Sequence, residues 1–260
     1  MATDKELYTP THPGAKGLTK IKKMHVPALD GAGSHMAAFM AGRALEKYVA
    51  PIIGCGVPVG TGHWTTHVSG TGATVAHSSG KSTGLKFTTP TDDNFNMSYQ
   101  SLMTWDFSST NLDGKWVCMI FRVHVDDIAN IGFALGLGNT QVQNFTTDFT
   151  NKVVFNKAIA AGAVTGVVRS ASGTARATGT LGTLVNDTEV ELAVTFKKGA
   201  TAAASAGAWW YNGTKTAFTS DQLTALAALT GALQFTVNCT GVTGASKNMT
   251  VAAGYGDLDK

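Results

Sequence analysis

The chain has 260 residues, of which 43% are hydrophobic and only 14% are charged. Its formal net charge of +3 is too small for the dense basic surface that nucleic-acid binding requires. The sequence also lacks a run of about 18 apolar residues, which a membrane-spanning helix needs. We therefore expect neither nucleic acid nor a membrane as a partner. Threonine, serine, asparagine and glycine supply most of the polarity, and this composition is typical of short strands joined by tight turns.

The first 35 residues predict an extended arm. They contain three prolines and few large apolar side chains, so the segment cannot bury enough apolar surface to order itself alone. It is either a loose terminus or an arm that orders against a neighbouring subunit. Its basic cluster consists of Lys16, Lys20, Lys22 and Lys23.

Residues 34–48 predict a short helix within this N-terminal part. Ser34 can cap it, because its hydroxyl can accept a backbone N–H of the first turn. Gly42 weakens the prediction, and the helix should end before Pro51. We assign residues 1–59 to an arm with one helix and residues 60–260 to a folded domain. The apolar side chains that fall near one face of the helix are Met36, Phe39, Met40 and Leu45.

The folded domain shows strand periodicity. Apolar residues alternate with polar or small ones in the stretches 117–125, 131–138, 189–196 and 233–239. Turn residues separate these stretches, and no strand–helix–strand rhythm appears. The fold class expected from this pattern is all-β: an antiparallel β-sandwich, interrupted only by a short capped helix at 220–231.

The three cysteines predict neither a disulfide framework nor a zinc site, because their number is odd and no CxxC spacing occurs. Cys118 and Cys239 fall within predicted strands and are expected to be small buried hydrophobic residues. Residues 1–10 contain no apolar signal region, so we expect synthesis and folding in a reducing cytoplasm.

The stretch 206–218, AGAWWYNGTKTAF, predicts a hairpin. Asn212 and Gly213 suit a type I′ turn, in which both central residues need positive φ. Trp209 and Tyr211 should then point to one face of the hairpin and Trp210 to the other. We expect at least one of the two tryptophans to belong to the core, and the other could lie on the second face of the sheet.

The order of these segments resembles the C-terminal half of concanavalin A-like (laminin-G-like) jelly-roll domains. The strand VELAVTF, the WWYNGTKT hairpin, a short helix and two long strands ending at Asp257 carry the resemblance, and 116–139 is similar to the central strands of that family. The resemblance implies a jelly roll over roughly residues 60–260. The chain lacks a cluster of Asp and Asn with calcium-loop spacing, so we do not expect a calcium-dependent sugar site.

Standalone domains of this kind with an N-terminal arm also resemble tailed-bacteriophage virion proteins, of the capsid decoration (cement) and tail-associated types. The resemblance implies a non-enzymatic structural protein on the capsid surface, bound to the major capsid protein and assembled as a homotrimer. The arm and helix would form the partner interface through Lys16, Lys20, Lys22, Lys23, Met36, Phe39, Met40 and Tyr48.

The alternative hypothesis is a carbohydrate-binding, lectin-like module of a phage tail or fibre. In that case one of Trp209, Trp210 or Tyr211 would stack on a sugar, because aromatic faces offer a large contact area at little entropic cost.

Catalytic chemistry is not expected. Glu189 and Glu191 share one strand face, and glycosidases of this fold family use paired strand carboxylates, but Ala193 occupies the third position of the family's acidic pattern. We interpret the pair as a solvated strand face and predict no catalytic residue.

We also expect no bound metal or other cofactor. His63 and His67 have helical metal-site spacing in a segment that does not favour a helix. The strand-end group of His124, Asp126 and Asp127 could bind a cation, although such groups more often end a strand in solvent.

Overall fold

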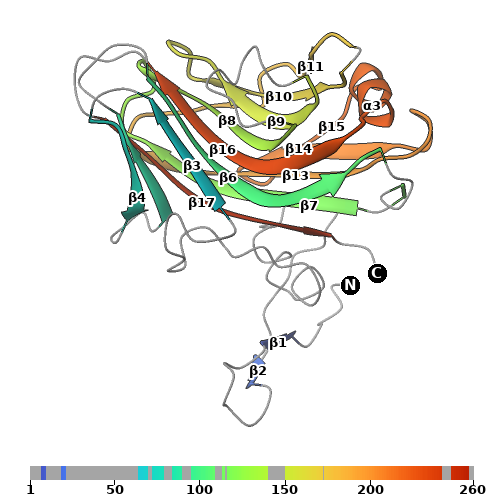
Figure 1. Cartoon of the computed structure of the whole chain (residues 1–260), viewed down its shortest axis with the longest axis horizontal. Helices are drawn as coiled ribbons and strands as arrows, with labels where there is room; N and C mark the ends of the chain where they lie inside the picture. Colours follow the sequence, from blue (N-terminus) through green and yellow to red (C-terminus); the bar gives the residue numbers. More distant parts are fainter. Residues whose placement is uncertain are drawn as a thin grey trace.

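The computed structural model describes residues 7–9, 19–21, 64–69, 72–78, 84–89, 95–108, 113–114, 116–139, 150–171, 173–241 and 247–257. Two antiparallel sheets pack face to face (Figure 1). The eight-stranded sheet contains, in spatial order, β11 (Arg176–Ala177), β10 (Ala163–Arg169), β9 (Lys152–Lys157), β8 (Ile131–Gly138), β16 (Ala232–Gly241), β6 (Phe95–Asp106) and β3 (Trp64–Ser69), with β12 (Gly182–Thr183) also paired to β10. The seven-stranded sheet contains β15 (Thr214–Ala217), β14 (Ala206–Tyr211), β13 (Thr188–Lys197), β7 (Trp116–Val125), β17 (Asn248–Asp257), β5 (Gly84–Thr88) and β4 (Thr74–Ser78). The predicted antiparallel β-sandwich is therefore confirmed.

The described part of the N-terminal segment forms a strand pair that the sequence did not predict. β1 (Leu7–Thr9) pairs antiparallel with β2 (Thr19–Ile21), and Lys20 lies in β2 opposite Tyr8. The remaining predictions for the N-terminal part lie outside the described residues. They concern Lys16, Lys22 and Lys23 of the basic cluster and the predicted helix 34–48 with its interface residues Met36, Phe39, Met40 and Tyr48. No helix in the described ranges is long and apolar enough to cross a membrane.

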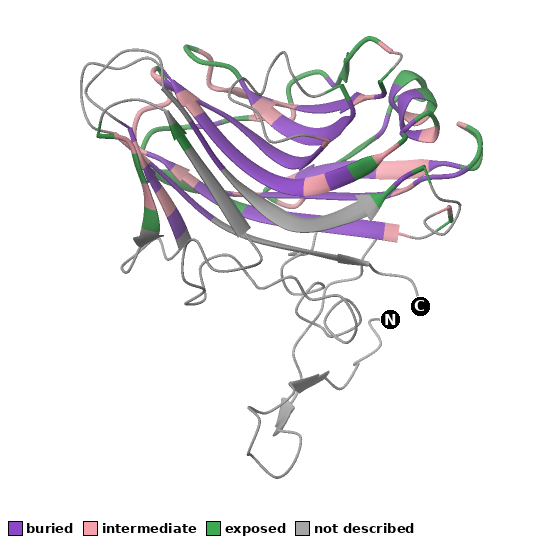
Figure 2. Ribbon diagram, in the orientation of Figure 1, coloured by how far each residue is buried: buried purple, intermediate pink, exposed green. Residues whose placement is uncertain are grey.

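The core lies between the two sheets, as the strand pattern predicts. Along β7, Phe121 faces inward, with its ring centroid 5.4 Å from that of Phe235 on β16 and 6.1 Å from that of Phe155 on β9. Figure 2 shows the inner strands as nearly continuous buried bands. Full burial of each such side chain stabilises the fold by about 1.5–3 kcal/mol. The aromatic contacts also fix how the two sheets lie on each other.

The predicted hairpin joins β14 to β15. Asn212 has φ +46° and Gly213 has φ +80°, so both central residues adopt the left-handed backbone that the turn requires. The Asn212 side chain accepts a hydrogen bond from the backbone N–H of Glu191 at 2.8 Å, and its own N–H donates to the Glu191 carbonyl. These two bonds hold the turn against the neighbouring strand β13.

Trp209 is the core residue of the hairpin. Its side chain is 0% exposed and stacks on Phe218, with ring centroids 4.8 Å apart, while Phe155 meets its edge at 5.0 Å. Gly166 on β10 provides the space for the indole, because a Cβ atom on this glycine would lie 2.3 Å from the ring. The expectation that at least one tryptophan of the pair is core is confirmed.

Helix α3 (Ser220–Ala227) begins with a capping box. The Thr219 hydroxyl accepts the N–H of Gln222, and the Gln222 side-chain oxygen accepts the N–H of Thr219. The same oxygen accepts the indole N–H of Trp209 at 3.3 Å, and the Gln222 amide donates to the carbonyls of Gly166 and Arg176. One buried glutamine therefore joins the helix, the hairpin and the edge of the eight-stranded sheet.

We predict that Gly166→Ala destabilises the sandwich by about 1–3 kcal/mol, because the added methyl overpacks the Trp209 site. The matched control is Gly179→Ala, where a Cβ atom would meet nothing within 4 Å. The control should change the free energy of unfolding by less than about 0.5 kcal/mol. Urea denaturation monitored by circular dichroism measures both. Equal stability of the two variants would contradict the packing described for Trp209.

Candidate functional site

The outer face of the eight-stranded sheet is the best candidate for a binding site. Figure 1 shows its strands curving, with the hollow side turned away from the seven-stranded sheet. A hollowed sheet face can hold an extended ligand along its whole length.

The floor of this concave face is strand β8. Its inward residues are large, and Gly132, Ala134, Gly136 and Gly138 alternate with them on the concave side; all eight residues of β8 are buried, including Ala134 at 1% exposed. Gly136 has φ +151°, and a Cβ atom there would lie 2.2 Å from the carbonyl oxygen of Val153. The floor therefore consists of backbone and methyl groups without large side chains, and it is buried together with Val154 of β9 and Val167 of β10.

Polar side chains flank the floor on both sides. Asn238 of β16 and Asn156 of β9 lie directly opposite Ala134, one on each side. Gln234 of β16 and Lys152 of β9 flank Gly138 in the same way. Side chains directly opposite on neighbouring strands are about 5 Å apart, so each polar–small–polar rung spans a width suited to a narrow chain-like ligand.

The two rungs differ in accessibility and charge. Asn156 and Gln234 are half-buried, as is Thr240 at the end of β16, whereas Asn238 is 1% exposed and donates its amide to the carbonyl of Met97. Lys152 lies opposite Arg169 of β10. Burial first, and then the charge of Arg169, lowers the pKa of the Lys152 ammonium to about 8. Among the described residues of β8, β9 and β16, the half-buried polar groups of the face are thus two amides and a hydroxyl, and Lys152 is 6% exposed beside the half-buried Arg169.

The aromatic residues predicted for sugar stacking lie elsewhere. Trp209 is in the core and offers no ring face to a ligand. Trp210 is on the outer face of the seven-stranded sheet and is 3% exposed, with the Lys215 ammonium 5.8 Å from its ring centroid. Tyr211 packs on Gly182 and donates its hydroxyl to the Thr183 carbonyl at 2.7 Å, and burial raises its pKa. Stacking by Trp210 or Tyr211 stays a prediction, at a place separate from the concave face.

The carboxylate pair considered for catalysis is also on the other sheet. Glu189 and Glu191 lie on the outer face of β13, where the register places them opposite His124 and Arg122. A carboxylate oxygen of Glu189 is 3.7 Å from the Arg122 guanidinium, and both side chains are exposed. This arrangement is that of a solvated strand face with a weak ion pair.

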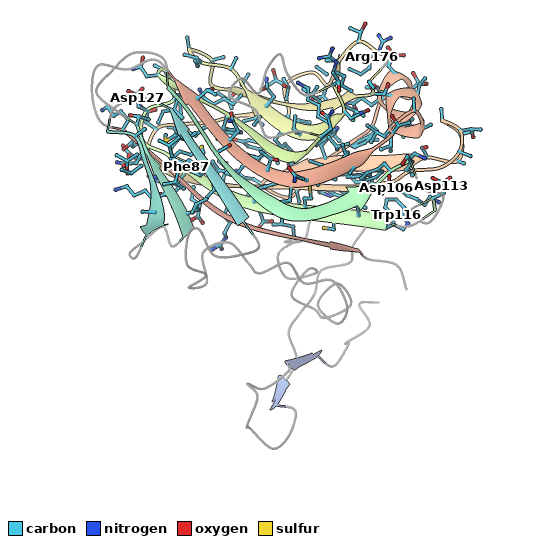
Figure 3. The ribbon with its side chains drawn as sticks, in the orientation of Figure 1. Phe87, Asp106, Asp113, Trp116, Asp127 and Arg176 are labelled. Atoms are coloured by element: carbon cyan, nitrogen blue, oxygen red, sulfur yellow. The ribbon has the colours of Figure 1, made fainter. Side chains whose placement is uncertain are left out.

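The strand-end group considered for a cation is occupied by hydrogen bonds from the protein. The Asp126 carboxylate accepts the backbone N–H and the side-chain amide of Asn248 at 2.7 and 2.9 Å. Asp127 accepts the side-chain amide of Asn130 at 2.9 Å and two backbone N–H groups, and these bonds, the Asn130 side chain first, lower its pKa. Figure 3 places Asp127 at one end of the sandwich, opposite the end that carries Asp106, Asp113 and Trp116.

No three potential metal ligands cluster anywhere in the described ranges. Of the other histidine pair considered, His67 lies in β3 and His63 is outside the described residues. The metal hypothesis therefore gains no support from the geometry.

The loop that follows β7 is held by an internal ammonium. Lys157 is 1% exposed, and its Nζ donates hydrogen bonds to the backbone carbonyls of Ile128, Ile131 and Ala158. Burial lowers the pKa of this ammonium to about 8, and the negative charge of Asp127 opposes the shift. Because Lys157 ends β9, the same contact positions the strand that carries Asn156.

We predict a pH dependence that belongs to Lys157. The pKa of this group is about 8 in the folded chain, against an ordinary value of 10.5, so between these values the unfolded chain binds more protons. The free energy of unfolding that Lys157 contributes should therefore rise with pH across this window. Urea denaturation should be carried out on the natural chain and on Lys157→Met at several pH values. The free energy of unfolding of the natural chain minus that of the variant should increase as the pH rises. Lys152 is present in both proteins and cancels, and a difference that stays constant would contradict the assignment.

The comparisons with known proteins bear on the fold. No protein-family model matches this chain, and no curated protein matches its sequence. Among solved structures, the metal-free carbohydrate recognition domain of Emp46p is similar with a TM-score of 0.54 and 9% identity, over 80% of this chain and 95% of that domain. The globular domain of T. cruzi calreticulin has a TM-score of 0.55 and 12% identity, over 81% and 88%. Peanut lectin has a TM-score of 0.50 and 13% identity, over 82% and 98%. These likenesses confirm the predicted concanavalin A-like jelly-roll fold.

Proposed function

We propose that the sandwich is a carbohydrate-binding module and that an extended saccharide binds along the concave face of the eight-stranded sheet. The observation that carries the proposal is the pair of polar–small–polar rungs, in which Asn156, Asn238, Gln234 and Lys152 flank the small residues of β8. Lectin-type names among the structural neighbours, including a carbohydrate recognition domain, support the same class of ligand.

The chemistry of the rungs suits a saccharide. Amide side chains and hydroxyls both donate and accept hydrogen bonds, as sugar hydroxyls do. A floor of glycine and alanine contributes no large side chains that would obstruct a sugar ring, and binding sites with few but well-placed polar groups give orientation and specificity. The cationic end at Lys152 and Arg169 would add preference for a saccharide with an acidic group at that end.

Binding without conversion fits the distribution of carboxylates. Glycosidases need two carboxyl groups at the scissile bond, about 5–5.5 Å apart in retaining enzymes and about 6.5–9.5 Å apart in inverting ones. Among the described strand residues of the concave face, the single carboxylate is Asp106 at the end of β6, and it accepts hydrogen bonds from Ser108. Glu189 and Glu191 lie on the other sheet.

We expect the double variant Asn156→Ala/Gln234→Ala to bind a soluble oligosaccharide at least about fivefold more weakly than the natural chain. Two lost hydrogen bonds contribute about 0.5–1.5 kcal/mol each. Isothermal titration calorimetry with oligosaccharides of glucose, galactose and mannose provides the measurement. The control Glu189→Ala removes a polar group from the seven-stranded sheet and should leave affinity unchanged. Absence of binding by the natural chain, or equal affinity of the double variant, would refute the proposal.

The second candidate function is that of a phage capsid decoration protein, located on the virion surface and contacting the major capsid protein through the arm. The observation in its favour is that β1 and β2 pair with each other and with no strand of either sheet. The described part of the arm therefore forms its own element, as an attachment arm would.

This second candidate predicts a homotrimer. Light scattering should give three times the mass of one chain for the natural protein, and deletion of residues 1–48 should lower it to the mass of a single chain, because the arm supplies the subunit contacts. A monomer at full length would contradict the trimeric decoration role. An unchanged trimer after the deletion would show that the arm is not required for assembly.

A further inference from the structure

A second apolar surface lies on the outer face of the seven-stranded sheet. The strand register places Ile120 beside Ala193, and Ala193 beside Trp210, on one rung across β7, β13 and β14. On the next rung Thr195 lies between Cys118 and Ala208. We name the apolar residues of these rungs the outer-face cluster, which consists of Cys118, Ile120, Ala193, Ala208 and Trp210.

The outer-face cluster is covered, although the core lies on the other side of its sheet. Each member is 4% exposed or less. Among the elements that the structure describes, the eight-stranded sheet packs on the inner side, and α3 packs against β10 and β11. These burial values are those of one chain, and no described helix or strand packs on this side of the sheet.

The longest stretch outside the described ranges is 22–63, between β2 and β3. The remaining gaps are shorter, and the gap 140–149 lies in the sequence between β8 and β9 of the opposite sheet. Within 22–63 lies the amphipathic segment 34–48, whose apolar positions include Met36, Phe39 and Met40. We propose that this segment docks on the outer-face cluster of its own chain.

The shape of the surface fits a helix with large side chains. Ala193 and Ala208 are small, and the register places Gly254 of β17 beside Ile120 and Gly256 beside Cys118. These positions carry small side chains or none, so long side chains such as Met and Phe of a docked segment can pack against them. Polar groups border the outer-face cluster, with the exposed Arg122–Glu189 pair at one end and Lys197, 5.7 Å from the ring centroid of Trp116, at the other. An apolar centre with a polar rim is the usual anatomy of a docking surface.

The proposal changes the role of the N-terminal segment and does not depend on saccharide binding. If residues 34–48 cover their own sheet, their apolar side chains are part of the folded protein and are not free for a partner. Contacts with another subunit would then fall to the residues before Ser34.

Cys118 provides a chemical readout of the cover. It belongs to the outer-face cluster, and burial raises the pKa of its thiol to about 12, so it should resist thiol reagents while covered. Cys239 is buried in the core between the sheets, and burial raises its thiol pKa as well. In a Cys55→Ser background these are the two remaining thiols of the chain. Cys239 therefore reports global unfolding, and Cys118 reports the outer face.

The test places charges on the apolar side of the segment in the full-length Cys55→Ser protein. With Phe39→Asp/Met40→Asp, we expect Cys118 to react with Ellman's reagent while Cys239 stays protected, as peptide mapping would show. The matched control Ala38→Asp/Ala41→Asp adds the same charges on the opposite helical face and should leave both thiols protected. If Cys118 stays as protected in the first variant as in the control, the proposal is wrong.

Unfolding of the charged variant would expose both thiols, and a second experiment then decides. Phe39→Cys, Met40→Cys and, as a control, Ala38→Cys are introduced one at a time into the Cys55→Ser chain and oxidised under native conditions. We expect an intramolecular disulfide to Cys118 from position 39 or 40 and none from position 38. Linkage from neither apolar position, or equal linkage from position 38, would overturn the docking arrangement.

Discussion

The contact between Trp209 and Gly166 constrains much of the sandwich. The indole comes from the seven-stranded sheet and lies on the backbone of β10 in the eight-stranded sheet, where any side chain at position 166 would collide with it. Phe155 meets its edge and Gln222 accepts its N–H, so β9 and α3 converge on the same ring. Because polar groups buried in a core must be hydrogen-bonded, the Gln222 network also fixes which way α3 faces. Because β9 and β10 belong to the eight-stranded sheet, the contacts of Trp209 also help to position the concave face.

The two sheets present different chemistry on their outer faces, and this difference organises the functional proposals. On the eight-stranded sheet, β8 contributes glycine and alanine, and its neighbours contribute amides, hydroxyls and a lysine. On the seven-stranded sheet, β7 is apolar on both sides over residues 117–121, so its outer side needs a cover as much as its inner side does. The first face suits a polar, chain-like ligand, and the second suits another element of the protein. A saccharide and the N-terminal segment therefore need not compete for the same surface.

The sequence predicted the fold and several elements, but it did not indicate the concave face that we propose as a binding site, for identifiable physical reasons. Alternation reveals which residues of one strand share a face, so the inward series of β7 and the core position of Cys239 followed from the pattern. Local turn chemistry predicted positive φ at Asn212 and Gly213, as observed. The rung of Asn238, Ala134 and Asn156 depends instead on which distant strands become neighbours, and no local pattern encodes that. Pattern also could not decide which of two adjacent tryptophans faces the core, because both faces of β14 are apolar. The β1–β2 pair escaped prediction because its strands are only three residues long.

The most direct test of the central claim is a map of the saccharide-binding surface by nuclear magnetic resonance. Backbone amide shifts of the full chain would be followed during titration with a soluble oligosaccharide that shows binding. Our account predicts shift changes concentrated in β8, β9 and β16, around Ala134, Asn156 and Gln234. Changes confined to the hairpin around Trp210 and Tyr211, or the absence of any saccharide-dependent change, would contradict it.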